Sequence, residues 1–211
     1  MKINFFIVSC FLITTEKGVR IIADPYYHNY RPDNPPPGLT VRPPIAEQAD
    51  VVTMTHGHAN NGYMHAVKGV PQLYTGGAPA EIKGVKFSGV TARHLYNHGK
   101  NTIIGIEADG IRIWHMGDFG QDKLYDEQLA RMGGVDILMT PWLEWTPTIL
   151  GQLKPKVVLP MKEAHVDNYM RSMKGFSDLT GKASELEFTS KTLPSEMKVI
   201  MLQPSLERDI K

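Results

Sequence analysis

The chain has 211 residues, 42% hydrophobic and 21% charged, which are ordinary proportions for a globular protein and enough for one well-filled domain over residues 1–211. Its 23 basic and 22 acidic residues leave a net charge of +1, so no strong field draws it toward nucleic acid or an anionic membrane. Its one cysteine, Cys10, excludes an internal disulfide framework. No run approaches the ~18 apolar residues of a membrane span, and we expect a cytoplasmic location.

The N-terminal third is predicted to consist of strands. Residues 3–8, 10–15 and 19–23 are apolar and β-branched, and a hairpin turn at residues 16–18 separates the last two. The apolar run before Cys10 also resembles a lipoprotein signal, but its nine residues fall short of the roughly 15–30 of secretory signals. We therefore interpret Cys10 as a buried small hydrophobe. A proline-rich surface loop follows at residues 31–38.

The rest of the chain mixes strands with short helices. Asp109-Gly110 is a strong two-residue hairpin signal between two of the strands. Two loops, residues 26–44 and 141–150, are expected to border a binding cleft. Strands are predicted at residues 49–54, 72–74, 85–87, 90–93, 102–108, 111–115, 135–139, 157–159, 185–188 and 197–202, and helices at 61–67, 123–132 and 162–174. This order of elements predicts two sheets sandwiched between helices.

The stretch Thr55-His56-Gly57-His58, directly after the predicted strand 49–54, is the most informative in the chain. Two histidines one residue apart on an extended segment point the same way, because side chains in a strand repeat with a period of two. Both imidazoles can then reach one metal ion at the roughly 2.0–2.1 Å of a zinc–nitrogen bond. One buried, hydrogen-bonded histidine in an ordinary strand is the alternative interpretation of the pair alone.

Motifs spread over nearly the whole chain resemble the metallo-β-lactamase superfamily of metal-dependent hydrolases, and within it the ascorbate-phosphate-lactonase-like (UlaG-like) branch. The residues that carry this resemblance are 18–25, 49–52, 55–58, 99–102, 109–112, 115–118, 135–138 and 155–160. Their order and spacing match the family from end to end. The resemblance implies an α/β protein with the four-layer αββα fold, in which helices flank two mixed β-sheets.

The resemblance also implies roles for single residues. The first metal would be held by His56, His58, His94 and Asp118, and Asp118 occupies the place of the carboxylate that bridges two metals in the family. Asn60, Asn61 and Lys162 stand where the family has the other ligands of the second metal. We expect one metal site, with the Lys162 ammonium standing in for the charge of the second ion beside Asp118.

This set predicts a hydrolase in which one metal-bound water, its pKa lowered toward ~7, attacks an ester, lactone, amide or phosphoester of a small-molecule substrate. Asp118 would orient that water or take its proton, and Lys162 would stabilise the developing anion. One Zn²⁺ per chain is expected, with Mn²⁺, Fe²⁺ or Ni²⁺ as alternatives. The alternative function is a catalytically degenerate binding module with an empty or structural metal site. A nuclease is disfavoured, because the charge is near neutral.

Other histidines and tryptophans have weaker signals. His115 is interpreted as a packed strand residue rather than a ligand, and His98 and His165 are secondary candidates for the cleft. Trp142 and Trp145 are expected either to wall a substrate pocket or to pack under a loop. An exposed Trp145 and the proline-rich loop would be available for a contact between copies, so the sequence leaves a homo-oligomer open.

Overall fold

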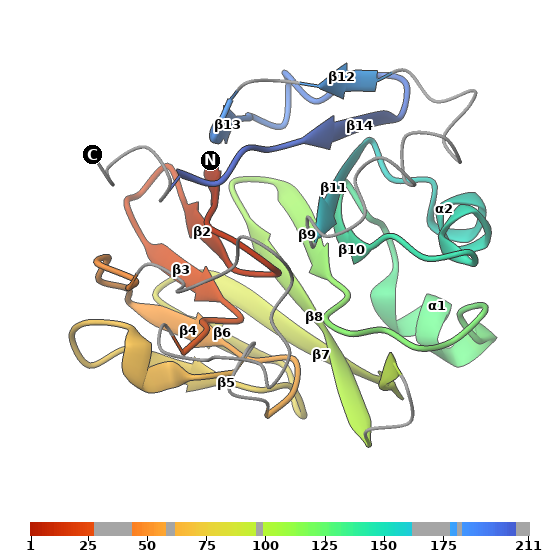
Figure 1. The fold of residues 1–211 in the computed structure, drawn as a ribbon. Helices are drawn as coiled ribbons and strands as arrows, with labels where there is room; N and C mark the ends of the chain where they lie inside the picture. Colours follow the sequence, from red (N-terminus) through yellow and green to blue (C-terminus); the bar gives the residue numbers. More distant parts are fainter. Residues whose placement is uncertain (28–43, 58–61, 96–98, 162–177, 181–182, 206–211) are drawn as a thin grey trace, which may run out of the picture.

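A computed structural model of the protein describes residues 1–27, 44–57, 62–95, 99–161, 178–180 and 183–205. Two sheets face each other in it (Figure 1). The smaller sheet has the strand order β13-β1-β2-β3-β4-β5. Its strands are β1 (Lys2–Phe5), β2 (Phe11–Thr14), β3 (Arg20–Ala23), β4 (Val51–Thr53), β5 (Gln72–Tyr74) and β13 (Glu185–Glu187).

The larger sheet has eight strands in the order β12-β14-β11-β10-β9-β8-β7-β6. Its strands are β6 (Ala80–Ile82), β7 (Val85–Arg93), β8 (Lys100–Ala108), β9 (Ile111–His115), β10 (Ile137–Pro141), β11 (Val157–Met161), β12 (Asp178–Thr180) and β14 (Lys198–Met201). The sheet is mixed, because β6 to β9 pair antiparallel, whereas β9, β10, β11 and β14 pair parallel.

The core forms layers because neighbouring strand residues point to opposite faces of a sheet. In β9 and β10, Ile113 and Ile137 pack between the two sheets, whereas Trp114 and Leu138 pack on the outer side of the larger sheet. On that outer side lie α1 (Asp126–Met132) and α2 (Thr146–Leu153) (Figure 1). A third apolar cluster covers the outer side of the smaller sheet next to the 3₁₀ helix η1 (Met64–Ala66).

The predicted architecture is confirmed: the two mixed sheets form a sandwich, with helices on the outer side of the larger sheet. The hairpin at Asp109-Gly110 is also confirmed. Both residues have the positive φ that a type I′ turn requires, 56° and 72°. The strands predicted at 85–87 and 90–93 are one continuous strand, β7, whose Gly89 packs against the backbone of Gly76.

The prediction of a loop over residues 141–150 holds only for residues 142–145, because Pro141 is the last residue of β10 and α2 begins at Thr146. Pro147 lies in the first turn of α2, where proline is tolerated. The helix predicted at residues 162–174 lies outside the described residues, as does most of the loop at 26–44. None of the helices in the described ranges has the length and apolar character that crossing a membrane requires.

Candidate metal centre

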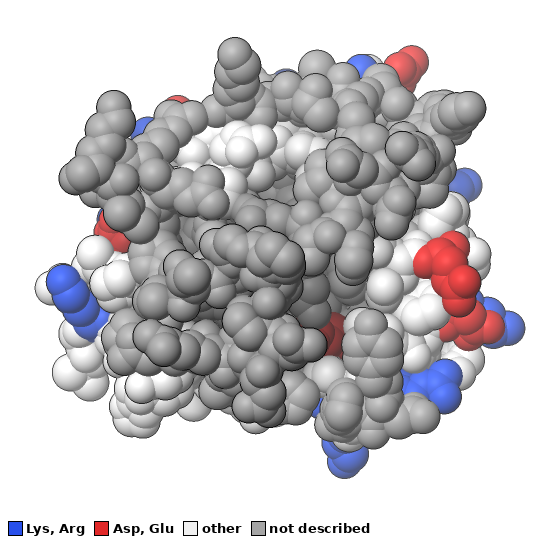
Figure 2. Space-filling view, viewed as in Figure 1, with Lys and Arg blue, Asp and Glu red and all other residues white. Residues whose placement is uncertain are grey.

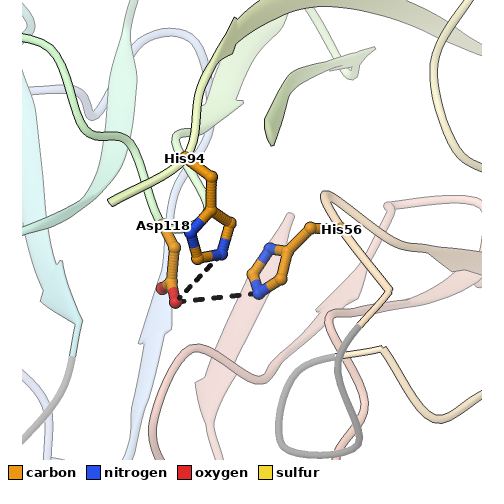
Figure 3. Close-up of side chains that lie close together, drawn as sticks. All are labelled: His56, His94 and Asp118. Carbon is orange, nitrogen blue, oxygen red and sulfur yellow. Dashed lines mark ion pairs between the residues drawn. The ribbon is translucent and has the colours of Figure 1, made fainter. Parts of the chain in front are cut away.

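Three side chains that follow strand ends, one in the smaller sheet and two in the larger, converge on one place. His56 comes three residues after β4, His94 directly after β7, and Asp118 three residues after β9. The three side chains point toward one another (Figure 3). One ligand atom from each lies within 4.8 Å of the others, so this group can hold a metal ion.

The distances between these atoms fit one small ion. Asp118 Oδ2 lies 3.7 Å from His56 Nε2 and 3.6 Å from His94 Nε2. Two atoms that bind one tetrahedral zinc at 2.0–2.1 Å lie roughly 3.3 Å apart. The two imidazole rings have centroids 4.6 Å apart and planes at 80°, so they are not stacked. Two imidazoles and a carboxylate are also a donor set that zinc and related transition metals accept.

All three side chains are buried, with 8%, 3% and 6% of the surface of His56, His94 and Asp118 exposed. A carboxylate in such a place needs compensation from cations or hydrogen-bond donors. A bound cation would provide that compensation, which is a second reason why the residues fit a metal.

The tautomer of His94 is set by the main chain. Its Nδ1 lies 2.6 Å from the carbonyl oxygen of Leu95. Because a carbonyl oxygen only accepts, Nδ1 carries the proton and donates it. Nε2 then keeps its lone pair on the side that faces Asp118, as a metal-binding histidine requires.

Main-chain hydrogen bonds join the segment after β7 to the segment after β9. Leu95 N donates to Asp118 O at 2.7 Å, and Gly120 N donates to Arg93 O at 2.9 Å. The two segments approach so closely that a Cβ on Gly120 would lie 2.5 Å from the Leu95 nitrogen. Only glycine fits there, and the close approach brings His94 and Asp118 to the same place.

The buried Asn101 of β8 fixes the turn that carries Asp118. Its Nδ2 donates to Met116 O at 2.8 Å, and its Oδ1 accepts the Asp118 N–H at 3.0 Å. Between these two bonds lies Gly117, with φ of 59°. A Cβ there would lie 2.4 Å from Asn101 Oδ1.

His56 is held from a different direction, by side chains. Thr55 lies beside it and places its Oγ1 2.8 Å from His56 Nδ1. Asp24, which follows β3, accepts hydrogen bonds from Thr55 N at 2.8 Å and from Thr55 Oγ1 at 2.6 Å. Asp24 has a φ of 46°, which is unusual for a residue other than glycine.

His115 is a packed residue, as the sequence predicted, and its side chain is fully buried. Its Nε2 donates to Ser9 O at 2.8 Å, and its Nδ1 accepts the Gly117 N–H at 3.2 Å. The imidazole is therefore neutral. Burial lowers the pKa of His115 to about 4.

The structure brings three of the four predicted metal ligands together: His56, His94 and Asp118. The fourth, His58, lies outside the described residues, and so do Asn60, Asn61 and Lys162. Their predicted roles stay predictions. His98 and His165 also lie outside the described residues.

Four further residues support the site but have no predicted role: Asp24, Asn101, Gly117 and Gly120. Asp24 did carry a signal, because Asp24-Pro25 directly follows Ala23, the last residue of β3. Asn101 and Gly117 lie in motifs that carry the family resemblance, and Gly120 lies in none; the roles of all three come from contacts with distant segments.

Of the two interpretations of Trp142 and Trp145, packing is the one observed. Trp142 is buried beside α1 and α2, and Trp145 packs against the same cluster. Trp145, directly before α2, is half-buried by this packing and therefore only partly exposed. Cys10 is fully buried, and burial raises the pKa of its thiol.

Acidic and basic side chains of the described residues lie next to one another at the edge of the face in Figure 2. Charges of opposite sign also pair elsewhere in the described residues, where Glu107 forms ion pairs with both Lys86 and Arg112. No basic stripe of the kind that nucleic-acid binding requires is visible among the described residues of this face.

Residues 2–162 match the family described as Beta-lactamase superfamily domain. A solved structure from Thermotoga maritima, a proposed Zn-dependent hydrolase of the metallo-β-lactamase superfamily, is 27% identical. It covers 95% of this chain and 97% of its own, with a TM-score of 0.72.

Two further solved structures share the fold. A proposed metal-dependent hydrolase from Parabacteroides distasonis is 15% identical and covers 95% of this chain and 93% of its own, with a TM-score of 0.62. A metallo hydrolase from Ignicoccus hospitalis is 19% identical and covers 96% and 95%, with a TM-score of 0.60. No curated protein matches the sequence.

Proposed function

The chain belongs to the metallo-β-lactamase superfamily, and we propose that it is a hydrolase that uses one metal ion to cleave an ester, lactone, amide or phosphoester bond in a small molecule. The observation that carries the proposal is the convergence of His56, His94 and Asp118, whose ligand atoms lie within 4.8 Å of one another. His58, two residues after His56, is the fourth proposed ligand. Zinc is the proposed metal.

When bound, the metal supplies a Lewis acid and lowers the pKa of a coordinated water. The protein's own contribution is positioning. Asp118 is buried, and its Oδ2 faces the Nε2 atoms of both histidines. It is therefore placed to orient a water and to accept its proton during attack. The water oxygen bonds to the carbonyl or phosphoryl centre, the ester or amide bond breaks, and the leaving group takes up a proton.

The single-ion form of the proposal rests on the sequence. Asn60, Asn61 and Lys162 replace the family's ligands for a second ion, while His56, His58 and His94 are retained. We propose that the Lys162 ammonium takes over part of the second ion's charge beside Asp118. The ascorbate-phosphate-lactonase-like branch is the proposed subfamily, on the same motifs.

Elemental mass spectrometry of protein purified without chelator tests the proposal. We expect about one zinc per chain, and turnover in a panel of esters, lactones, amides and phosphodiesters. His94→Ala should lose both metal and turnover. His65→Ala is the matched control, because His65 is exposed and outside the cluster, and it should keep both.

Each other outcome contradicts a defined part of the proposal. About two metal ions per chain would contradict the single-ion form and the role of Lys162. Failure to bind zinc even after its addition would contradict the hydrolase and leave a binding module on a metal-free fold. Turnover that survives His94→Ala would place the chemistry elsewhere.

A further inference from the structure

A line of three buried side chains leads from β3 to the metal centre. The Asp24 carboxylate, the Thr55 hydroxyl and the His56 imidazole are 1%, 3% and 8% exposed. Asp24 Oδ2 lies 2.6 Å from Thr55 Oγ1, which lies 2.8 Å from His56 Nδ1. Water has little access to these atoms, so the hydrogen bonds among the three side chains determine which atoms carry the protons.

The direction of each hydrogen bond follows from the chemistry of the groups. Asp24 accepts the main-chain N–H of Thr55 on Oδ1. Its Oδ2 is a carboxylate oxygen as well, so in the short contact with Thr55 Oγ1 it is also the acceptor. The single hydroxyl proton of Thr55 therefore goes to Asp24. Toward His56 the Thr55 oxygen has only lone pairs to offer, so Nδ1 of His56 carries the proton.

We propose that Asp24 and Thr55 are positioning residues that hold His56 as its Nδ1–H tautomer, which presets Nε2 as a metal ligand. The inference rests on the proposed function, because it concerns the same metal. His94 reaches the same tautomer through the Leu95 carbonyl. The two histidines thus present equivalent nitrogens by different means, one through the main chain and one through a pair of side chains.

The local backbone is arranged around this line. Asp24 adopts a left-handed φ of 46°, while its N–H donates to Thr53 O at 2.9 Å. Such a conformation is strained for aspartate and persists only where the surroundings hold it. The hydroxyl of Thr53, two residues before Thr55, is buried but has no hydrogen-bond partner among the described residues. A buried hydroxyl near the end of β4 does not by itself bond to Asp24 and His56. Of these two hydroxyls, only that of Thr55 lies where it can contact both.

The test compares Thr55→Val with a matched control, Thr53→Val. Both changes replace a buried hydroxyl by a methyl of the same shape at the end of β4. Zinc affinity is measured by competition with a chromogenic chelator. We expect Thr55→Val to weaken zinc binding by about 10–100-fold, whereas Thr55→Ser and Thr53→Val stay within about threefold of wild type.

A second measurement reads the tautomer directly and needs no metal. Long-range ¹H–¹⁵N correlation spectra of the metal-free protein should show His56 protonated at Nδ1 in the wild type and in Thr55→Ser. In Thr55→Val the spectrum should shift toward the Nε2–H form. Asp24→Asn serves if Thr55→Val does not fold: an amide nitrogen facing Thr55 releases the hydroxyl proton toward His56, so the same shift and weaker zinc binding are expected.

The outcomes separate this inference from the proposed function. Zinc binding by Thr55→Val within about threefold of wild type, with Nδ1 still protonated, would overturn the inference and leave the hydrolase intact. A wild type that binds no zinc would overturn the hydrolase. In that case the tautomer spectra of the metal-free proteins alone decide whether Asp24 and Thr55 set the protonation of His56.

Discussion

At the ends of β7 and β9, main-chain bonds and glycines bring His94 and Asp118 together, whereas at the end of β4 side chains hold His56. The larger-sheet side of the centre depends on how closely two backbone segments approach. The smaller-sheet side depends on a buried carboxylate and a hydroxyl. Substitutions that add atoms should therefore have their largest effect on the first side, and on the second side the largest effect should come from substitutions that remove side-chain hydrogen bonds.

The two sides are also joined. Thr55 O accepts the main-chain N–H of Thr102, next to Asn101 in β8, at 2.8 Å. His115 of β9 reaches across to Ser9 O in the loop between β1 and β2. The positions of the three proposed ligands are consequently coupled, and a disturbance on one side should be felt in metal affinity as well as in stability.

The strongest expected effect comes from adding one methyl group to the larger-sheet side. In Gly120→Ala the new Cβ would meet the main chain of His94 and Leu95 at 2.5 to 2.6 Å. Backbone atoms cannot give way as a flexible side chain does. We expect a loss of more than about 3 kcal/mol in the free energy of unfolding, measured by urea denaturation, together with weaker zinc binding.

Gly57→Ala is the control on the smaller-sheet side. A Cβ at Gly57 would meet no atom within 4 Å in the described part of the chain. Its free energy of unfolding should stay within about 0.5 kcal/mol of wild type. Equal losses in the free energy of unfolding for the two variants would show that the close backbone approach at Gly120 does not determine stability.

His115 predicts a dependence of stability on pH. Its pKa is lowered to about 4 from an ordinary 6.5 by burial, so between these values the unfolded chain binds a proton that the folded protein does not. This contribution is fully present above pH 6.5 and is lost as pH falls toward 4. It amounts to about 3 kcal/mol over that window.

Urea unfolding of metal-free protein at several pH values between 7 and 4.5 measures it. His115→Gln should flatten the loss of stability with falling pH relative to wild type. His65→Gln, at an exposed position, should leave the loss unchanged. A slope that is the same in wild type and His115→Gln would mean that other groups cause the acid sensitivity.

Asn101 tests the polar part of the larger-sheet side. Asn101→Ala leaves the Asp118 N–H and the Met116 carbonyl without the side chain that bonds both. The expected loss is about 2 kcal/mol in the free energy of unfolding. Asn4→Ala removes an exposed bond to Glu185 and should lose well under about 1 kcal/mol. An equally small loss for Asn101→Ala would contradict its proposed hold on Asp118.

Much of this architecture could be predicted because local chemistry determines it. β-Branched runs ended by turn residues located most strands, and the sequence Asp109-Gly110 fixed one hairpin by its need for positive φ. His56 was identifiable from its spacing to His58 after a predicted strand, whereas His94 and Asp118 were identified through the family resemblance; in the structure each of the three follows a strand end within three residues. Side chains at strand ends have few directions available, so their convergence is a property of the sheet order.

The supporting residues could not be predicted, because their roles arise from contacts between distant segments. Gly120 matters because Leu95 lies against it, and Asn101 matters because it bonds a turn 15 to 17 residues further on. The helix α2 was missed for a different reason. Proline is typical of loops, so Pro147 favoured a loop. In the first turn of a helix, however, main-chain N–H groups have no intrahelical acceptor, so the missing N–H of Pro147 costs no helical hydrogen bond.

The smallest expected effect lies at the other end of β4, away from the metal centre. Asp50 precedes β4 and accepts the Arg20 N–H at 2.8 Å, and it also pairs with Lys83, whose side chain is 54% exposed. The hydrogen bond from the Arg20 main chain, followed by the one from Lys83, lowers the pKa of Asp50.

Because solvent screens the exposed ion pair, Lys83→Met should change the free energy of unfolding by less than about 0.5 kcal/mol. Asp50→Ala should lose about 1 kcal/mol, since it also removes the acceptor of a main-chain donor. Urea unfolding at low and high salt separates the two. A larger loss for Lys83→Met than for Asp50→Ala would mean that the ion pair, and not the bond to the main chain, holds this end of the strand.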